Sequence, residues 1–234
     1  DKPLFHLDSK NPFGLNEAGG YIINPTFADI DGDGDSDAMI GDVSGNIAFF
    51  QNNGAGTLPY FSSGDSFNFN EASYFSDPIF VDIDGDGDID IVSFEPDGSY
   101  ASYYQNLVVE ENLGLETFKY LRKDLCWGKF SENQFNEEIK LSADPFSCAD
   151  YFLTGGNQGN RHSGSSLCLL DYDGDKDKDL LIGDLGSSRM KLLLNGGSRE
   201  NAHVTSFDQT FPKDDNPIFM DIFLAAYHVD VDAD

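Results

Sequence analysis

Residues 29–37 read DIDGDGDSD and place five aspartates at alternate positions. Two like charges repel by about 1 kcal/mol at 4 Å in bulk water, and by more near a protein surface, so this loop needs a cation. Its donors are hard oxygens without imidazole or thiolate, which favours calcium over zinc or copper. Glycines at positions 4 and 6 suit a chain that turns tightly around one ion. The sequence predicts a calcium loop in which Asp29, Asp31, Asp33 and Asp37 supply carboxylates and Asp35 its backbone carbonyl.

An EF-hand is the main alternative for such a loop. It would need a bidentate Glu at position 12 and a helix after the loop. Here position 12 is Ile40, and the segments DAMIGD and NIAFFQN are apolar, aromatic and interrupted by glycine. This pattern favours a strand, a turn and a second strand.

The loop recurs in two further complete copies and one partial copy, which disfavours a merely acidic, solvated turn. The expected carboxylate ligands of the complete copies, each with the carbonyl of its position 7, are Asp82, Asp84, Asp86 and Asp90 with Asp88, and Asp171, Asp173, Asp175 and Asp179 with Asp177. The partial copy contributes Asp230, Asp232 and Asp234. In the third copy Lys176 replaces the glycine of position 6. A left-handed lysine costs on the order of 1 kcal/mol, so we expect this site to be weaker.

The segments around each loop repeat as well. Every complete loop follows an apolar segment and precedes two more, which end in FFQNNG, YYQN and LLLNGG, and TLPYF supplies a fourth strand in the first copy. Four short antiparallel strands at intervals of about 50 to 60 residues are typical of a propeller blade. We therefore expect an all-β protein, a β-propeller of four-stranded antiparallel blades.

The succession of apolar strand, DxDGDGxxD, DLLIGD and NxG resembles the FG-GAP or VCBS repeats of integrin-α-like β-propellers, over most of residues 20–107 and 160–200. The resemblance implies that calcium loops join the first two strands of each blade. CWGKF and RHSGSSLCLLDYDGDKDKDLLIGD are also similar to VCBS-repeat surface or secreted proteins of Bacteroidetes-type bacteria. It implies no single activity, because propellers host many.

The repeats suggest one partial propeller over residues 1–234. DKPLF matches TLPYF, and the last residues begin a blade without finishing it, so we expect a fragment of a propeller with roughly six to eight blades. The expected parts are an outer strand and connector of a preceding blade (1–20), three blades (21–75, 76–122 and 161–212), an inserted segment overlapping a blade edge (108–160), and the start of a further blade (213–234).

Charge and composition restrict the partners. A formal net charge of −28 disfavours nucleic acid and anionic membranes, which require basic surface. No apolar stretch is long enough to span a membrane. Weak calcium modules function outside the cell, where binding at about 10⁻⁴ to 10⁻³ M suffices, so we expect a secreted or cell-surface protein.

Three other residue types carry expectations. Cys126 and Cys148 are predicted to form a disulfide worth about 3 kcal/mol, and Cys168 to lie in the core. Trp127 could stack on a sugar ring, but packing of the inserted segment is the favoured interpretation. The histidines, at positions 6, 162, 203 and 228, are scattered; His162 could contact a ligand, but a hydrogen bond that anchors its loop is the favoured interpretation.

No catalytic residue is predicted. The sequence contains no GxSxG, HExxH, P-loop or CxxC pattern, and paired aspartates lose diagnostic value when so many are assigned to metal. The leading hypothesis is an extracellular, non-enzymatic module for protein or glycan recognition or adhesion, with structural calcium. The alternatives are a propeller part of a secreted polysaccharide-degrading enzyme and a passive scaffold in a large surface protein.

Overall fold

The computed structural model describes residues 24–31, 33–41, 46–54, 59–68, 78–95, 99–114, 119–133, 138–150, 165–184, 187–213, 215–220 and 224–227. Apart from the short 3₁₀ helix η2 (Trp127–Lys129), the regular elements in these ranges are strands, as the all-β prediction requires. None of the described residues forms a helix with the length and apolar character needed to cross a membrane.

Twelve of the strands form three four-stranded antiparallel sheets. The first contains β1 (Asn24–Ala28), β2 (Asp37–Gly41), β3 (Asn46–Asn52) and β4 (Phe61–Asn68). The second contains β5 (Ile79–Val81), β6 (Asp90–Phe94), β7 (Ala101–Asn106) and β8 (Tyr120–Asp124). The third contains β11 (Ser165–Leu170), β12 (Asp179–Asp184), β13 (Lys191–Asn195) and β14 (Val204–Asp208). A small two-stranded sheet pairs β9 (Phe130–Glu132) with β10 (Ile139–Leu141).

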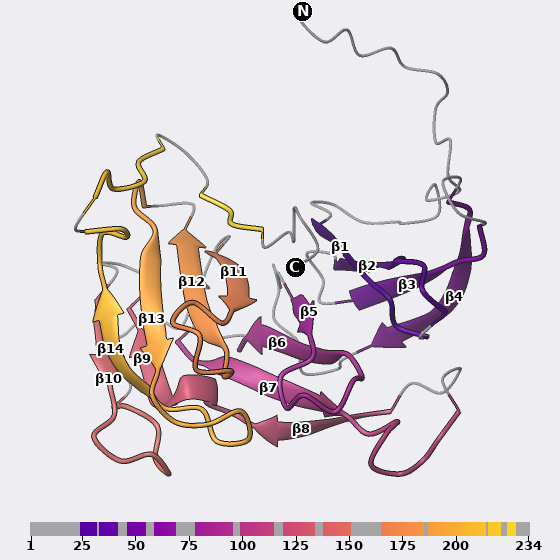
Figure 1. Ribbon diagram of the computed structural model, residues 1–234, viewed down its shortest axis with the longest axis horizontal. Helices are drawn as coiled ribbons and strands as arrows, with labels where there is room; N and C mark the ends of the chain where they lie inside the picture. Colours follow the sequence, from indigo (N-terminus) through magenta and orange to yellow (C-terminus); the bar gives the residue numbers. More distant parts are fainter. Residues whose placement is uncertain are drawn as a thin grey trace, which may run out of the picture.

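The three larger sheets lie around a common centre, with their first strands innermost (Figure 1). The inner strand β5 contacts both β1 and β11. Strands follow one another in chain order from the centre outwards, which is the topology of propeller blades. The described residues thus form three blade-like sheets and do not close a ring.

Each complete acidic loop joins the first two strands of its sheet. The residue before the loop pairs with the loop's ninth residue, as Ala28 with Asp37, Val81 with Asp90 and Leu170 with Asp179. The aspartate at position 9 is therefore the first residue of the second strand, and each loop is a tight connection between two paired strands.

Apolar side chains hold neighbouring sheets together. One buried cluster joins the first sheet to the second and includes Met39, Phe49, Ile91 and Tyr104. A larger cluster joins the second sheet, the third sheet and the segment between them. Trp127 belongs to this larger cluster and is only 2 % exposed, which confirms that it packs the inserted segment and excludes stacking on a sugar.

The cysteines correct one expectation. Cys168 is buried, as predicted, but Cys126 and Cys148 are free thiols rather than a disulfide. Burial, with a side-chain hydrogen bond to Cys148, raises the pKa of the Cys126 thiol. The Cys126 thiol also donates a hydrogen bond to the Phe130 carbonyl at 3.6 Å. Because the thiolate is the reactive form, this environment disfavours oxidation of Cys126.

An ion pair connects the small sheet to the third blade. Lys191 on β13 and Glu132 on β9 bond through side chains that are 1 % and 0 % exposed, respectively. The Glu132 backbone N–H also donates to the Ser99 carbonyl at 3.0 Å, so the same residue reaches the second sheet's β6–β7 connection. Losing one partner would leave a buried charge without compensation.

We expect Lys191→Met to lower the free energy of unfolding by about 3 to 5 kcal/mol, because it strands the Glu132 carboxylate in the core. The double variant Lys191→Met/Glu132→Leu should recover most of that loss, since it removes both charges. Chemical denaturation of the two variants and the parent measures both effects. A single variant within about 1 kcal/mol of the parent would contradict this account of the pair.

Candidate metal centre in the acidic loops

The structure brings three predicted carboxylates together in every complete loop. In each group, one oxygen per residue lies within 4.8 Å of the others: Asp29, Asp31 and Asp33; Asp82, Asp84 and Asp86; Asp171, Asp173 and Asp179. Asp37, Asp90 and Asp175 lie outside these groups. Asp230, Asp232 and Asp234 fall outside the described residues, as does His162.

The aspartate at position 9 of each complete loop acts as a clamp between the loop and the third strand. Both oxygens of Asp90 accept backbone hydrogen bonds, from Ile83 at 3.0 Å and from Asn106 at 2.8 Å. The first copy repeats the pattern through Asp37, at 3.2 Å from Ile30 and 2.8 Å from Asn52. The third repeats it through Asp179, at 2.9 Å from Tyr172 and 2.8 Å from Asn195. We call this contact the aspartate clamp.

The asparagine of the clamp also orders the turn that follows it. The Asn52 side-chain oxygen accepts the backbone N–H groups of Gly54 at 3.0 Å and Tyr60 at 3.1 Å. The Asn195 oxygen accepts those of Gly197 at 3.0 Å and His203 at 2.8 Å. Sequence reasoning assigned these asparagines only to turns. The signal that could have revealed the clamp is the recurrence of this asparagine at the end of each third strand.

The aspartate at position 3 of the loop accepts a hydrogen bond from a glutamine in the first two copies. Gln51 donates to Asp31 at 2.7 Å, and Gln105 donates to Asp84 at 2.6 Å. The third copy has Leu194 at this place and lacks a side-chain donor there.

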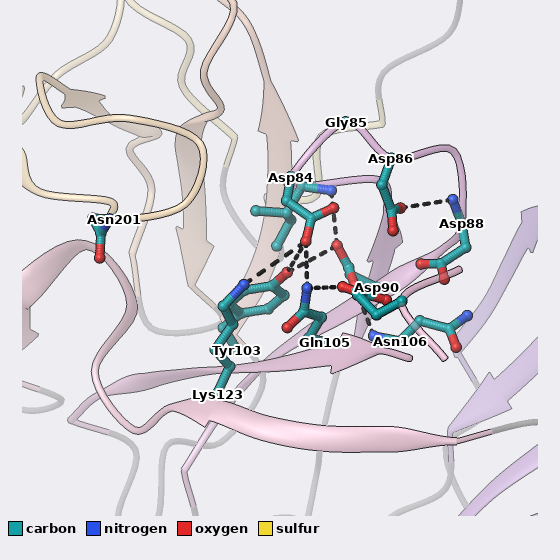
Figure 2. Close-up of polar contacts among 12 residues, drawn as sticks. Asp84, Gly85, Asp86, Asp88, Asp90, Tyr103, Gln105, Asn106, Lys123 and Asn201 are labelled. Atoms are coloured by element: carbon teal, nitrogen blue, oxygen red, sulfur yellow. Dashed lines mark hydrogen bonds and ion pairs between the residues drawn. The ribbon is translucent and has the colours of Figure 1, made fainter. Parts of the chain in front are cut away.

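The second loop gains two more contacts to Asp84 (Figure 2). The Tyr103 hydroxyl donates to Asp84 at 3.3 Å or Asp90 at 3.1 Å, and the Lys123 ammonium lies 3.8 Å from Asp84. The second loop is therefore more extensively supported by its blade than the third.

Backbone conformation at position 6 follows the sequence prediction. Gly34 and Gly87 have φ of 94° and 99°, and Lys176 adopts the same left-handed region with φ of 77°. In this conformation the backbone N–H of position 6 faces the first aspartate, at 3.0 Å in the first loop and 3.1 Å in the third. The third loop thus keeps the shape of the others and carries the strain of a left-handed lysine.

The donor set fits a hard cation. Among the described residues, Asp84, Asp88 and Asp177 each have one buried carboxylate oxygen, Oδ1, with no hydrogen-bond partner. A buried charged oxygen left unsatisfied is costly, and a bound cation would compensate it. Oxygen-only donors in a flexible loop suit calcium.

Burial raises the pKa of several loop carboxyls, and neighbouring carboxylates raise it further. The pKa of Asp90 reaches about 7, that of Asp177 about 7 and that of Asp88 about 6. The pKa values of Asp37, Asp86 and Asp179 are raised as well. Without metal, the loops therefore hold protons at pH values where free aspartate is ionised.

We expect the stability of the metal-free chain to fall as the pH rises from 5 to 8. A carboxyl whose pKa is raised from 3.8 to about 7 binds more protons in the folded state than in the unfolded state across that interval. Its contribution is fully present below pH 4 and is lost through pH 7, at most about 1.4 kcal/mol per pH unit. Urea denaturation in chelator measures this trend. A metal-free stability that rises steadily over the interval would contradict it, and saturating calcium should reduce the slope.

Lys176→Gly should raise the free energy of unfolding by about 1 kcal/mol, because it removes the left-handed lysine. Lys178→Gly is the matched control: Lys178 lies in the same loop without a positive φ, so its replacement should destabilise. Equal effects of the two substitutions in denaturant titrations would refute the strain at position 6.

Comparison with known proteins gives one match. Residues 29–93 match the family model described as FG-GAP-like repeat. This span contains the first two acidic loops and runs from the end of the first blade's inner strand into β6. No curated protein and no solved structure shows significant similarity to the chain. Residues 29–93 thus carry an FG-GAP-like repeat, within blade-like sheets of an all-β fold.

Proposed function

We propose that the protein is an extracellular, calcium-stabilised β-propeller-like module for recognition or adhesion, in which calcium is structural. The observation that carries this proposal is the recurrence, in three loops, of clustered carboxylates tied to the third strand by the aspartate clamp. The FG-GAP-like repeat at residues 29–93 supports a recognition or adhesion role.

Calcium would be held by the aspartates at positions 1, 3, 5 and 9 of each complete loop, with the carbonyl of position 7. The ion would supply positive charge to a cluster that the protein itself neutralises little. An ionised carboxylate offers about four lone-pair sites, so the aspartate clamp leaves acceptor capacity for an ion. Calcium binding would then stabilise the link between the first strand pair and the third strand of a blade.

The setting follows from charge and affinity. A formal net charge of −28 leaves an acidic protein even with its ions bound, which disfavours nucleic acid and anionic lipid as partners. Loops of this kind need bind only at about 10⁻⁴ to 10⁻³ M where calcium is millimolar. Both arguments favour a secreted or surface protein whose partner is a protein or a glycan.

A pocket between the inner strands offers a place for such a partner. It has a volume of about 550 Å³ and is lined by residues of β1, β5 and β11 and by residues 225–227. Phe27 and Tyr227 line it and are 53 % and 69 % exposed. The described lining residues include no carboxylate, histidine or lysine, which favours binding over hydrolysis.

Calcium at 100 times its dissociation constant should raise the melting temperature of the chain over EGTA by roughly 5 to 11 °C for each site that binds it. An ion at 100 times its dissociation constant stabilises by about 2.7 kcal/mol per site, which is worth roughly 2 to 4 °C per kcal/mol at this chain size. Calorimetry with calcium, with EGTA and with magnesium as the control measures the effect. Asp33→Ala should remove one bound calcium. Superimposable melting curves in calcium and EGTA would reject the metal proposal.

Recognition at the pocket is tested on glycan arrays and on a panel of extracellular proteins. We expect Tyr227→Ala to weaken binding of any ligand found at least tenfold, because the exposed ring lines the pocket. Tyr60→Ala is the matched control, since Tyr60 is 62 % exposed and lies outside the pocket. Equal binding by both variants would move recognition away from the pocket. Turnover of a polysaccharide by the parent would favour the enzymatic alternative.

A further inference from the structure

A second group of carboxylates lies beside the second acidic loop. Oxygens of Asp86, Asp88 and Glu110 lie within 4.8 Å of one another. Glu110 is not part of the repeated loop and belongs to the turn that follows β7. The aspartates occupy positions 5 and 7 of the loop, and their carboxylates face one another (Figure 2).

The Asp88 side chain is buried at the centre of this group. The residue is 7 % exposed, and its Oδ1 has no hydrogen-bond partner among the described residues. Its Oδ2 accepts the Val109 backbone N–H at 3.1 Å. This bond fixes the carboxylate against the turn that carries Glu110. An ion that the loop binds through the backbone carbonyl of Asp88 would leave the buried side-chain Oδ1 of Asp88 without a partner.

Glu110 is oriented by the same glutamine that supports the calcium loop. Gln105 donates one hydrogen bond to Asp84 at 2.6 Å and another to Glu110. The nearby lysines are engaged elsewhere: Lys119 lies 2.5 Å from Glu111, and Lys123 lies 3.8 Å from Asp84. No described lysine or arginine forms an ion pair with Asp86, Asp88 or Glu110. The three converging carboxylates therefore have no ion-pair partner among the described lysines and arginines, although the Arg199 guanidinium lies against Gly85 of the same loop.

We infer that Asp86, Asp88 and Glu110 form a second divalent-cation site on the second blade, adjacent to the calcium loop and selective for a hard ion such as calcium. Asp86 belongs to both groups, so its carboxylate would lie between two ions. The inference goes beyond the proposed function and depends on it only through this shared residue.

Among the described residues, such a second carboxylate group occurs in the second copy and not in the first or third. Glu110 lies four residues after the clamp asparagine Asn106, and the residues at the same distance in the sequence are Gly56 in the first copy and Arg199 in the third. The Arg199 side chain instead donates to the Lys176 carbonyl in the third loop. Gly56 has no side chain to offer as a ligand and Arg199 is a cation, so neither copy has a carboxylate at this position in the sequence.

Counting calcium ions on the full chain tests the inference. Native mass spectrometry and calorimetric titration with calcium should show one ion fewer, or one site weakened at least tenfold, in Glu110→Gln. Glu111→Gln is the matched control, because Glu111 is the neighbouring acid and pairs with Lys119. It should bind as many ions as the parent. Both residues are exposed at the surface, so neither change is expected to unfold the protein.

Asp82→Asn separates this inference from the proposed function, since Asp82 belongs only to the calcium loop. A loss of one ion in Asp82→Asn and a further loss in Asp82→Asn/Glu110→Gln support two sites. Equal stoichiometry and affinity in Glu110→Gln and Glu111→Gln would overturn the second site. In that case, a loss in Asp82→Asn alone would leave the proposed calcium loop intact.

Discussion

The structure depends on keeping several carboxylates at the turns of tightly paired strands. In each complete loop the aspartate at position 9 lies at the start of the second strand, where its two carboxylate oxygens accept backbone N–H groups from the loop and from the third strand. This aspartate clamp connects the loop, the second strand and the third strand through one side chain. It also requires negative charge to lie in a buried place, and a bound cation would compensate that charge. The clamp would therefore link the fold of each blade to the proposed calcium.

Packing between blades supports the clamps. Apolar side chains of neighbouring sheets form shared clusters, and the segment after β8 fills the space between the second and third sheets with Trp127 and Phe130. The buried pair of Lys191 and Glu132 adds a directional contact in the same region. The second loop has the most contacts to its blade, through Tyr103, Gln105 and Lys123, whereas the third has a left-handed lysine and no glutamine donor. Calcium affinity is expected to follow this difference.

Spacing and alternation in the sequence predicted the structural features that depend on residues close together in the chain. The all-β class, the strands around each loop and the left-handed Lys176 follow from spacing, alternation and backbone sterics. Contacts between distant residues could not be derived in this way. Asp90 and Asn106 meet only because of strand register, and Lys191 and Glu132 are 59 residues apart in the chain. The free thiols of Cys126 and Cys148 show the same limit, because proximity along an inserted segment does not determine whether a bond forms.

Hydrogen exchange at the clamp amides tests the central claim most directly. The backbone N–H groups of Asn52, Asn106 and Asn195 each donate, at 2.8 Å, to the aspartate at position 9 of their loop. If calcium holds the loops, these three amides exchange much more slowly in calcium than in chelator, and the change is larger there than in strand amides remote from the loops. Equal exchange rates of the three amides under both conditions would contradict a structural role for calcium.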